Sequence, residues 1–271
     1  MFEASAPLSE RRQVARDMFV LGFDAPAVAA AAKAGQFVNL GLQPGPLLRR
    51  PFSVYRAGGG RVEIVLRAVG EGTSQLLSLR EGDLVSVLGP LGTGFRFDPA
   101  WRSVALVSGG LGLAPMLLAA RDARAAGLSV HWVHGARTAW DLGSEWDGEE
   151  ATWATDDGSR GFQGSAVAAV EEDFGAVLAC GPNPMLAAVA ERWPDAQVAV
   201  ETYMGCGTGV CLGCAVPLTA GGYDRACREG PVYRAADVDW PALPSHLYYT
   251  AVPVASPSRP SPATGGGEVP V

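Results

Sequence analysis

Hydrophobic residues in the first part of the chain come in short runs that glycine and proline separate. The runs with this pattern are Gln36–Leu40, Phe52–Tyr55, Arg61–Val69 and Leu84–Leu88. Short strands divided by frequent turns are typical of a small antiparallel barrel, here with one short helix over Thr73–Leu79. We therefore predict a β-barrel domain over residues 1–98.

From Trp101 onward, apolar runs of strand length alternate with longer, helix-like segments. The predicted strands are Val104–Ser108, Ser129–His134, Ala176–Ala179 and Val198–Val200. The predicted helices are one that opens near Pro115 and ends at Ala126, and two over Ala166–Glu172 and Asn183–Arg192. This alternation indicates a parallel sheet with helical crossovers. The second predicted domain, residues 99–200, is therefore an α/β domain.

The rest of the chain has neither pattern. A glycine-rich segment with four cysteines lies within residues 201–250, and the sequence from Ala255 onward is rich in serine, proline and glycine. Such a composition lacks core positions, so we predict a disordered tail over residues 251–271. The expected fold class is a multi-domain β plus α/β protein: an N-terminal antiparallel barrel, a parallel-sheet domain and a small C-terminal cysteine segment.

Composition and charge narrow the classes of partner. The 271 residues carry a net charge of −7 and a single lysine, Lys33, which argues against binding to nucleic acid. Hydrophobic residues make up 48% of the chain, enough to fill a core. The 35 glycines and 20 prolines predict many tight turns and close approaches of the backbone to ligands.

One stretch has the minimum length of a membrane-spanning helix. Eighteen uncharged residues lie between Arg102 and Arg121, but three glycines and Pro115 interrupt them, as expected for a strand, a turn and a helix. The first residues, Met1–Asp17, are charged and lack the apolar region of a secretory signal. We therefore expect a soluble, cytoplasmic protein without a membrane partner.

The strongest chemical signal is the spacing of four cysteines. They follow the pattern Cys206-x4-Cys211-x2-Cys214-x12-Cys227, which matches the plant-type ferredoxin pattern for a [2Fe–2S] cluster. Interleaved glycines let the loop wrap a cluster and direct backbone N–H groups toward its sulfurs. We predict that the four thiolates are cluster ligands.

Two other kinds of cysteine site fit less well. Structural zinc sites in zinc ribbons usually use two C-x2-C pairs, whereas only Cys211 and Cys214 form one here. A thioredoxin-like pair would leave Cys206 and Cys227 without a role. Zinc nevertheless remains the alternative to iron and sulfur.

A weaker signal lies in the barrel. Arg50-Pro51-Phe52-Ser53 opens a predicted strand, where an arginine can hold a phosphate and a serine hydroxyl can reach a flavin. Farther on, Gly72 and Thr73 lie where a predicted helix begins, and the N-terminal N–H groups of a helix can bind an anion. Alone, the first motif is also typical of an ordinary strand entry, and the second of a simple helix cap.

Two further segments follow strands of the α/β domain. Gly109-Gly110-Leu111-Gly112 is a glycine-rich turn that lacks the last glycine of the full dinucleotide fingerprint. Cys180-Gly181-Pro182 follows another strand, so both segments are expected at the carboxyl edge of the sheet, where α/β proteins bind ligands. A lone cysteine such as Cys180 is also compatible with simple packing. The three histidines, His131, His134 and His246, show no ligand spacing.

Taken in order, these segments resemble the ferredoxin-reductase superfamily. Within it, the chain is most similar to the electron-transfer subunits of dihydroorotate dehydrogenase B, which contain a flavin barrel, a nicotinamide domain and a C-terminal [2Fe–2S] segment. The resemblance rests on the motifs above together with Leu88-Gly89-Pro90-Leu91-Gly92, Thr155-Asp156-Asp157-Gly158-Ser159 and Cys227-Arg228-Glu229-Gly230-Pro231-Val232-Tyr233. It covers roughly residues 10 to 240.

The resemblance implies roles for individual residues. The residues implied to contact FAD are Arg50, Pro51, Phe52, Ser53, Arg67, Ala68 and Val69, of which the last three lie along a predicted strand. Gly72 and Thr73 are implied to bind the pyrophosphate of FAD. Those implied to face NAD(H) are Gly109, Gly110, Gly112, Cys180, Gly181 and Pro182. Cys206, Cys211, Cys214 and Cys227 would hold the cluster. No catalytic acid or base is implied in this chain.

The implied chemistry is electron transfer. Nicotinamide exchanges a hydride, an iron–sulfur cluster exchanges one electron, and a flavin can do both, so FAD must stand between them. The resemblance implies a partner subunit that oxidises dihydroorotate on FMN in pyrimidine biosynthesis, assembled as a heterotetramer. Electrons would pass through the cluster and FAD to NAD+.

Some questions stay open at the level of sequence. Another diaphorase subunit, of ferredoxin:NAD(P) oxidoreductase or hydrogenase type, fits the same motifs. Phe52 stands where these subunits commonly have an aliphatic residue. Arg137 could contact a 2′-phosphate, which leaves NADPH as an alternative to NADH.

Overall fold

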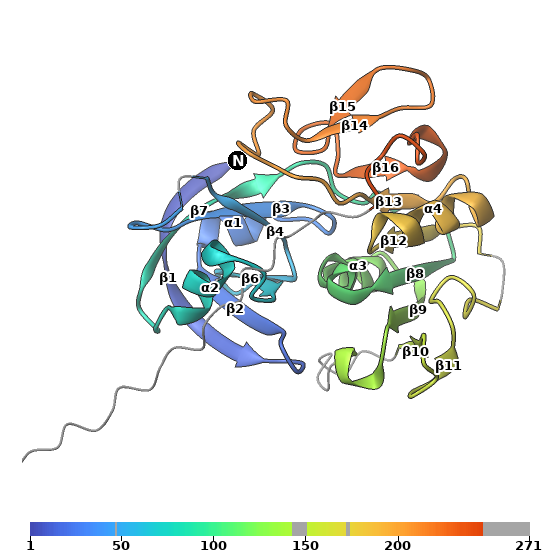
Figure 1. Cartoon of the computed structure of the whole chain (residues 1–271), viewed down its shortest axis with the longest axis horizontal. Coiled ribbons are helices and arrows are strands. Elements are labelled where there is room, and N and C mark those ends of the chain that lie inside the picture. The colour runs from blue at the N-terminus through green and yellow to red at the C-terminus, as the bar shows by residue number, and fades with distance from the viewer. Residues whose placement is uncertain (47, 143–150, 172–173, 246–271) are drawn as a thin grey trace, which may run out of the picture.

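The structure is a computed structural model that describes residues 1–46, 48–142, 151–171 and 174–245. His246 and the predicted tail lie outside the described residues. Figure 1 shows a curved sheet at the N-terminus, a second sheet flanked by helices, and a C-terminal segment that contacts both.

The first sheet is antiparallel and has the strand order β4-β3-β7-β1-β2-β6-β5. Its strands are β1 (Phe2–Gln13), β2 (Phe19–Asp24), β3 (Phe37–Gly41), β4 (Arg50–Ser53), β5 (Arg56–Gly58), β6 (Arg61–Leu66) and β7 (Leu84–Leu91). Two short helices, α1 (Pro26–Ala31) and α2 (Glu71–Ser78), accompany it. Alternate residues of β7 are buried, as the curved sheet of a half-barrel requires. The predicted barrel is confirmed.

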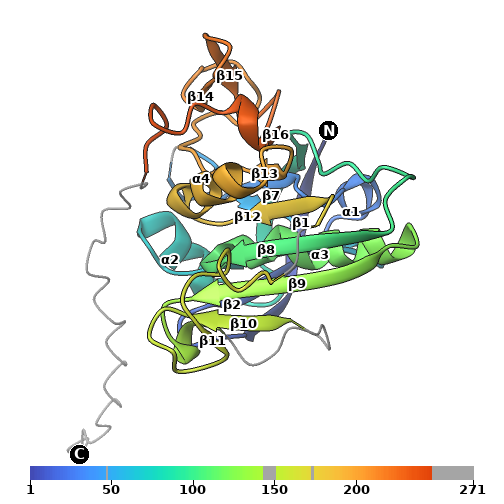
Figure 2. The same cartoon turned by 90° about the vertical axis from the view of Figure 1, so that its right-hand side faces the viewer.

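The second sheet has the order β11-β10-β9-β8-β12-β13-β16 and is parallel except at its last pair. Its strands are β8 (Ser103–Gly109), β9 (Ser129–Ala136), β10 (Thr152–Thr155), β11 (Phe162–Gln163), β12 (Val177–Cys180), β13 (Gln197–Ala199) and β16 (Val232–Arg234). The helices are α3 (Leu113–Ala125) and α4 (Asn183–Arg192), with single turns η1 (Gly110–Gly112) and η2 (Ala139–Asp141). Figure 2 shows these strands stacked side by side.

Each face of the second sheet packs against a different neighbour. Leu106 and Trp132 belong to the core that holds α3 and the barrel, whereas Val107 and Val133 belong to the core that holds α4 and the C-terminal segment. Side chains of a strand point alternately to its two faces, so an unbroken apolar run such as β8 is buried on both sides.

Three predictions about local structure are wrong. The segment Ala166–Glu172 is not a helix over its described part: it makes a single turn, in which Ala169 N donates to Ser165 O at 3.1 Å. The strand predicted over Arg61–Val69 ends at Leu66, so Arg67 to Val69 lie in the loop before α2. Val198–Val200, predicted as the last strand of the sheet because no later strand is predicted, is followed by β16, which pairs antiparallel with β13.

The C-terminal segment is small and is built on the other two parts. It contains the hairpin of β14 (Ala215–Pro217) and β15 (Tyr223–Arg225), then β16 and the turn η3 (Ala235–Asp237). By pairing with β13, β16 covers what would otherwise be an open sheet edge. The cysteine loop is thereby tied to the second sheet.

Among the described residues, no helix combines the length and the apolar character that a membrane crossing would need.

Candidate functional site

The two parts of the predicted flavin motif lie together. Arg50 opens β4, the edge strand of the first sheet, and Gly72 is in the first turn of α2. A Cβ atom on Gly72 would lie 2.9 Å from Arg50 Nε, so the guanidinium group packs directly over the glycine. Arg50 Nη1 donates to Leu48 O at 2.5 Å, which fixes the arginine beside the start of the helix. A cation and helix N–H groups at one point can bind a phosphate.

The hydroxyl of Thr73 shapes the turn before α2. Thr73 Oγ1 accepts hydrogen bonds from Val69 N at 2.9 Å and Gly70 N at 3.1 Å, and donates to Gly70 O at 2.9 Å. The hydroxyl is therefore engaged by the backbone. An anion at this turn would meet the N–H groups of the helix start instead.

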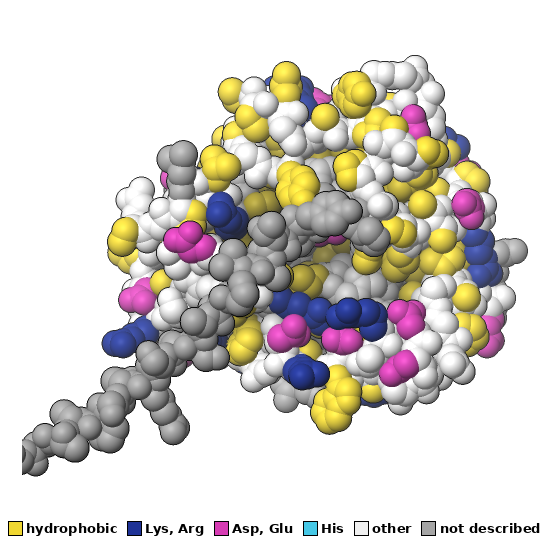
Figure 3. All heavy atoms as spheres, viewed as in Figure 1, with side chains coloured by type: hydrophobic (Ala, Val, Ile, Leu, Met, Phe, Trp, Pro, Cys, Tyr) yellow, Lys and Arg dark blue, Asp and Glu magenta, His cyan; other side chains and the backbone are white. Residues whose placement is uncertain are grey.

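Arg67 lies at the border between the barrel and the second sheet. Its side chain is 3.0 Å from Asp17 on the barrel side and 3.8 Å from Asp141 at the end of η2. Figure 3 shows the face of the molecule that Figure 1 presents, and basic and acidic side chains lie next to one another across its middle. Because Arg67 follows β6, it is placed by the loop rather than by the strand that the sequence predicted.

The two predicted nucleotide segments meet at the carboxyl edge of the second sheet. Ser108 pairs with Cys180 in the register of β8 and β12, so the turns that follow these strands are adjacent. A Cβ atom on Gly112 would lie 2.1 Å from Cys180 O, and one on Gly181 would lie 3.1 Å from Gly109 N. Only glycine fits at 112. The structure thus brings Gly109 to Gly112 and Cys180 to Pro182 into one site.

The thiol of Cys180 is not activated. Burial, together with the nearby charge of Glu201, raises the pKa of Cys180 to about 12. A protonated thiol is a poor nucleophile. The raised pKa therefore favours the protonated thiol of Cys180 at neutral pH.

A buried polar network beneath the nucleotide turn was missed at the level of sequence. Trp132 Nε1 donates to Ser108 Oγ at 2.8 Å, and Ser108 Oγ lies 2.8 Å from His134 Nδ1. Burial lowers the pKa of His134 to about 3, so the imidazole is neutral at physiological pH. The three side chains come from β8 and β9, whose register no spacing in the sequence reveals.

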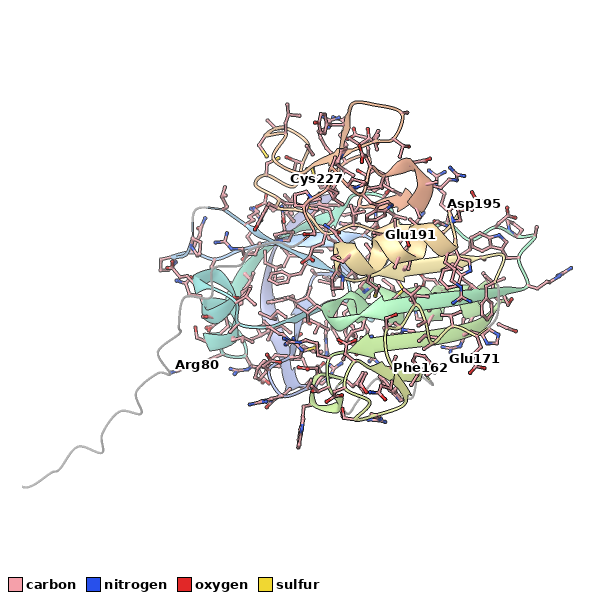
Figure 4. All side chains as sticks on the ribbon, turned by 45° about the vertical axis from the view of Figure 1, so that its right-hand side comes forward. Arg80, Phe162, Glu171, Glu191, Asp195 and Cys227 are labelled. Atoms are coloured by element: carbon pink, nitrogen blue, oxygen red, sulfur yellow. The ribbon has the colours of Figure 1, made fainter. Side chains whose placement is uncertain are left out.

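The cysteine loop is preorganised around its sulfur atoms. Thr208 N and Cys211 N donate to Cys206 Sγ at 3.3 and 3.4 Å, and Gly213 N donates to Cys211 Sγ at 3.4 Å. Gly207 and Gly209 have φ values of +70° and +85°, which favour glycine. Figure 4 shows Cys227 at the base of this segment, near the second sheet and α4.

The thiols differ in acidity. Burial raises the pKa of Cys206, but hydrogen bonds from the Cys211 and Thr208 backbone outweigh it and lower the pKa to about 5. Burial and the neighbouring Cys214 raise the pKa of Cys227 to about 12. Because metal ligands must be thiolates, Cys227 would lose its proton on binding iron.

Hydrogen bonds link Cys206 with Cys211 and Cys214 with Cys227. Cys206 N bonds to Cys211 Sγ at 3.4 Å, and the side chains of Cys214 and Cys227 are hydrogen-bonded to each other. No three His, Cys, Asp or Glu side chains in the described part of the chain converge as one metal ion would require. Tetrahedral zinc needs all its ligands at one ion, whereas a two-iron cluster takes two thiolates at each iron. Four thiolates at this spacing are the donor set of a [2Fe–2S] cluster.

An ion pair braces the loop from the side of Cys227. Arg225 Nη1 donates to Gly209 O at 2.9 Å, and Arg225 Nε donates to Glu229 Oε2 at 3.0 Å. The hydrogen bonds from Arg225 lower the pKa of Glu229 to about 2, so the pair stays charged. The loop between Cys206 and Cys211 is thereby linked to the residues that flank Cys227.

Contacts from the barrel also hold the cysteine loop. Asn39 Nδ2, on β3, donates to Cys206 O at 3.1 Å. At the other end of the loop, Thr93 N donates to Gly230 O at 2.6 Å, and Thr93 Oγ1 donates to Glu229 O at 3.3 Å. No local sequence pattern indicates Asn39 or Thr93, because each bonds to a residue more than 100 positions away in the chain.

Comparisons with known proteins agree with this arrangement. The sequence model for the iron–sulfur cluster binding domain of dihydroorotate dehydrogenase B matches residues 201–239, and that for the oxidoreductase FAD-binding domain matches residues 5–95. A "dihydroorotate dehydrogenase B (NAD(+)), electron transfer subunit" from Bacillus caldolyticus is 36% identical over 247 residues, covering 85% of this chain and 96% of the relative. The protein of the same name from Clostridium perfringens is 34% identical, covering 78% of this chain and 89% of the relative.

Solved structures share the fold. A structure of NADH-dependent reduced ferredoxin-NADP oxidoreductase, an electron-bifurcating flavoprotein, superposes with a TM-score of 0.79 at 29% identity, covering 88% of this chain and 91% of that chain. Phthalate dioxygenase reductase superposes with a TM-score of 0.58 at 20% identity, covering 88% of this chain and 95% of that chain. The second likeness concerns the fold alone.

Proposed function

The chain belongs to the family of electron transfer subunits of dihydroorotate dehydrogenase B, and from this premise we propose how its three parts divide the work. The chain passes electrons from a partner subunit that oxidises dihydroorotate, through a [2Fe–2S] cluster and FAD, to NAD+. This reaction belongs to pyrimidine biosynthesis. The division at residues 1–98, 99–200, 201–250 and 251–271 is part of the proposal.

The observation that carries the proposal is the cysteine loop. Backbone N–H groups donate to the sulfurs of Cys206 and Cys211, and Gly207 and Gly209 with positive φ let the loop close around them. Hydrogen bonds to the sulfurs favour thiolates and tune the reduction potential of a cluster. Cys206, Cys211, Cys214 and Cys227 would be the ligands.

In the barrel, the chain's own residues would bind and orient FAD. Arg50 and the N–H groups of Gly72 and Thr73 would hold its pyrophosphate, and Phe52 and Ser53 on β4 would lie along the flavin. Arg67, Ala68 and Val69 would contact it from the loop after β6. When bound, FAD supplies the exchange between two-electron and one-electron chemistry.

In the second sheet, the nucleotide turns would bind NAD(H). The backbone of Gly110 would face a ligand at the carboxyl edge of the strands, because a Cβ atom there meets nothing within 4 Å, whereas Gly109 and Gly181 are buried under Met185 and would support the turn from below. Pro182 is the N-cap residue of α4 and is exposed at this edge. None of these residues needs to exchange a proton, because the reaction is electron and hydride transfer.

The partner would dock where the cluster is nearest to solvent. Val210, Leu212 and Tyr223 are 82%, 64% and 75% exposed, and the first two flank Cys211. An open hollow of about 470 Å³ beside them is lined by Leu212, Tyr223 and Arg225 among others. Exposed apolar side chains in one area are typical of a protein interface. We propose that the FMN-containing catalytic subunit binds here, in a cytoplasmic heterotetramer.

A second function remains a candidate because of one observation. The 29% identical structure with a TM-score of 0.79 is a ferredoxin-NADP oxidoreductase rather than a dihydroorotate dehydrogenase. Under this second candidate function, the chain would serve as a diaphorase subunit that exchanges electrons with ferredoxin. The two functions share every cofactor and differ in the partner.

Co-expression with each kind of partner separates them. The proposal predicts that this chain copurifies with an FMN-containing dihydroorotate dehydrogenase subunit and that the complex reduces NAD+ when dihydroorotate is added. A matched preparation of the catalytic subunit alone should not reduce NAD+. Complex formation with a ferredoxin-dependent subunit, without dihydroorotate-driven NAD+ reduction, would decide for the alternative.

A further inference from the structure

One buried amide joins the flavin side of the molecule to the cluster side. Asn39 lies in the middle of β3 and is fully buried. Its Nδ2 donates to the carbonyl oxygen of Cys206, the first cluster ligand, at 3.1 Å. Its neighbour across the β3–β4 ladder is Pro51, inside the Arg50–Ser53 flavin motif. A single side chain therefore separates the flavin strand from the backbone of a cluster ligand.

The cluster loop is shaped to accept this side chain. A Cβ atom on Gly207 would lie 2.0 Å from Asn39 Nδ2 and 3.0 Å from Asn39 Cγ. Gly207 also has a φ of +70°, a conformation that side chains rarely adopt. The loop thus comes close enough for the hydrogen bond only because residue 207 is glycine.

The amide is poorly explained as a packing residue. Asn39 Oδ1 has no hydrogen-bond partner among the described residues, although the atom is buried. An unsatisfied buried acceptor destabilises a fold, and an apolar side chain of similar size would avoid it. The amide instead lies between the predicted flavin site and the predicted cluster site.

We propose that Asn39 is a positioning residue, which fixes the backbone of Cys206 against the flavin strand and sets the rate of electron transfer between FAD and the cluster. This proposal rests on the proposed function. The step it governs moves one electron: reduced FAD is oxidised by one electron, and the cluster is reduced from two ferric ions to one ferric and one ferrous. No bond to Asn39 forms or breaks.

The test uses the full-length protein with both cofactors bound. Anaerobic NADH is mixed with it, and the flavin absorbance and the EPR signal of the reduced cluster are followed in the same time course. In Asn39→Leu, the amide is replaced by an apolar side chain of similar size. We expect NADH to reduce FAD at the unaltered rate, whereas cluster reduction slows at least about tenfold, the factor that a barrier higher by about 1.4 kcal/mol produces.

Two further variants keep the test independent of how well Asn39→Leu folds. Gly207→Ala acts from the other side of the contact and should slow cluster reduction in the same way. Thr93→Val is the matched control, because it removes part-buried hydrogen bonds to Glu229 O and Val232 O at the far end of the loop and leaves Asn39 in place. We expect Thr93→Val to transfer electrons within about twofold of the original rate.

Iron, sulfide and flavin contents are measured for each variant, so that rates are compared only per loaded cluster. Unaltered cluster reduction in Asn39→Leu and Gly207→Ala would overturn the proposal. Equal slowing in Thr93→Val would also overturn it, because any loosening of the loop would then suffice. If the original protein shows no cluster reduction by NADH at all, the proposed function fails instead.

Discussion

At the scale of single residues, the predicted flavin site in the first sheet and the predicted nucleotide site in the second each contain a glycine in close contact with a neighbouring group. The neighbour is an arginine side chain in the first site and the backbone of another segment in the second. Gly72 lies under Arg50, and Gly112 lies against Cys180 O, where a Cβ atom would be 2.1 Å away. Chain turns that hold nucleotides need such close approaches. The high glycine content of the chain is therefore concentrated in part where ligands are expected.

The two arginines at the start of β4 allow a matched test of the flavin site. Arg50→Gln should raise the Kd for FAD at least about tenfold, because a charge-assisted hydrogen bond to phosphate contributes about 1.5–3 kcal/mol. Arg49 instead bonds to Ser86 Oγ at 2.9 Å and pairs with Glu3, away from α2. Arg49→Gln should leave the Kd unchanged in a fluorescence titration of the flavin-free protein. Equal effects of both substitutions would remove Arg50 from the site.

The nucleotide turn offers a second matched pair. Gly112→Ala must displace the Cys180 backbone, so we expect the free energy of unfolding to fall by more than about 3 kcal/mol and NADH binding to be lost. A Cβ atom on Gly110 meets nothing within 4 Å, although its φ is +54°. Gly110→Ala should therefore cost only about 1–2 kcal/mol. Urea unfolding of both variants checks this order, and a reversed order would contradict the described turn.

At the scale of elements, the cysteine segment is held by side chains from both sheets. The chain contains two asparagines, Asn39 and Asn183, and both are buried and bonded to the backbone of this segment. Asn183, at the start of α4, donates to Glu201 O at 3.0 Å and to Pro244 O at 2.9 Å, and accepts from Glu201 N at 3.3 Å. One residue thus fixes the beginning and the end of the segment.

Removing the side chain of Asn183 should weaken the attachment of the cysteine segment. Asn183→Ala loses three hydrogen bonds and leaves buried backbone groups unsatisfied, so the free energy of unfolding should fall by about 2–4 kcal/mol. Gln197 makes two comparable amide bonds to Arg96, but at an exposed position where water can replace them. Gln197→Ala should cost less than about 1 kcal/mol. If Asn183→Ala lowers the free energy of unfolding no more than Gln197→Ala does, the hydrogen bonds of Asn183 are unimportant for holding the cysteine segment.

The sequence was informative where the signal is local. Helix α4 was predicted with its observed bounds, because Pro184 and the alanine-rich run mark its start and length. The four cysteines were predicted as ligands from their spacing alone. By contrast, β1, with Pro7 and several charges, was not predicted as a strand, since its polar pattern shows no clear alternation.

Contacts between distant segments could not be predicted. The pairing of β16 with β13, the bond from Asn39 to Cys206 and the network of Ser108, Trp132 and His134 each join residues that only the folded chain brings together. The helix predicted over Ala166–Glu172 is wrong for a related reason. Ala166, Val167, Ala169 and Val170 are apolar because they are buried in the core beside the second sheet, and this burial does not require a helix. Tertiary packing overrode the local pattern.

At the scale of the whole molecule, the cysteine segment is the part that contacts both of the others, the barrel and the second sheet (Figure 1). Thr93 and Asn39 attach it to the barrel, and β16 and Asn183 attach it to the second sheet. Its exposed side faces solvent with Val210 and Leu212. This arrangement suits a chain in which electrons enter at the cluster and leave at the nucleotide.

The order of the redox centres is the central claim, and Cys211→Ser tests it directly. In complex with the dihydroorotate-oxidising partner, this variant should lose the cluster and with it the reduction of NAD+ by dihydroorotate. NADH should still reduce the bound FAD at the original rate, because hydride transfer does not pass through the cluster. Persistent dihydroorotate-dependent NAD+ reduction without the cluster, or loss of FAD reduction by NADH while FAD remains bound, would contradict the account.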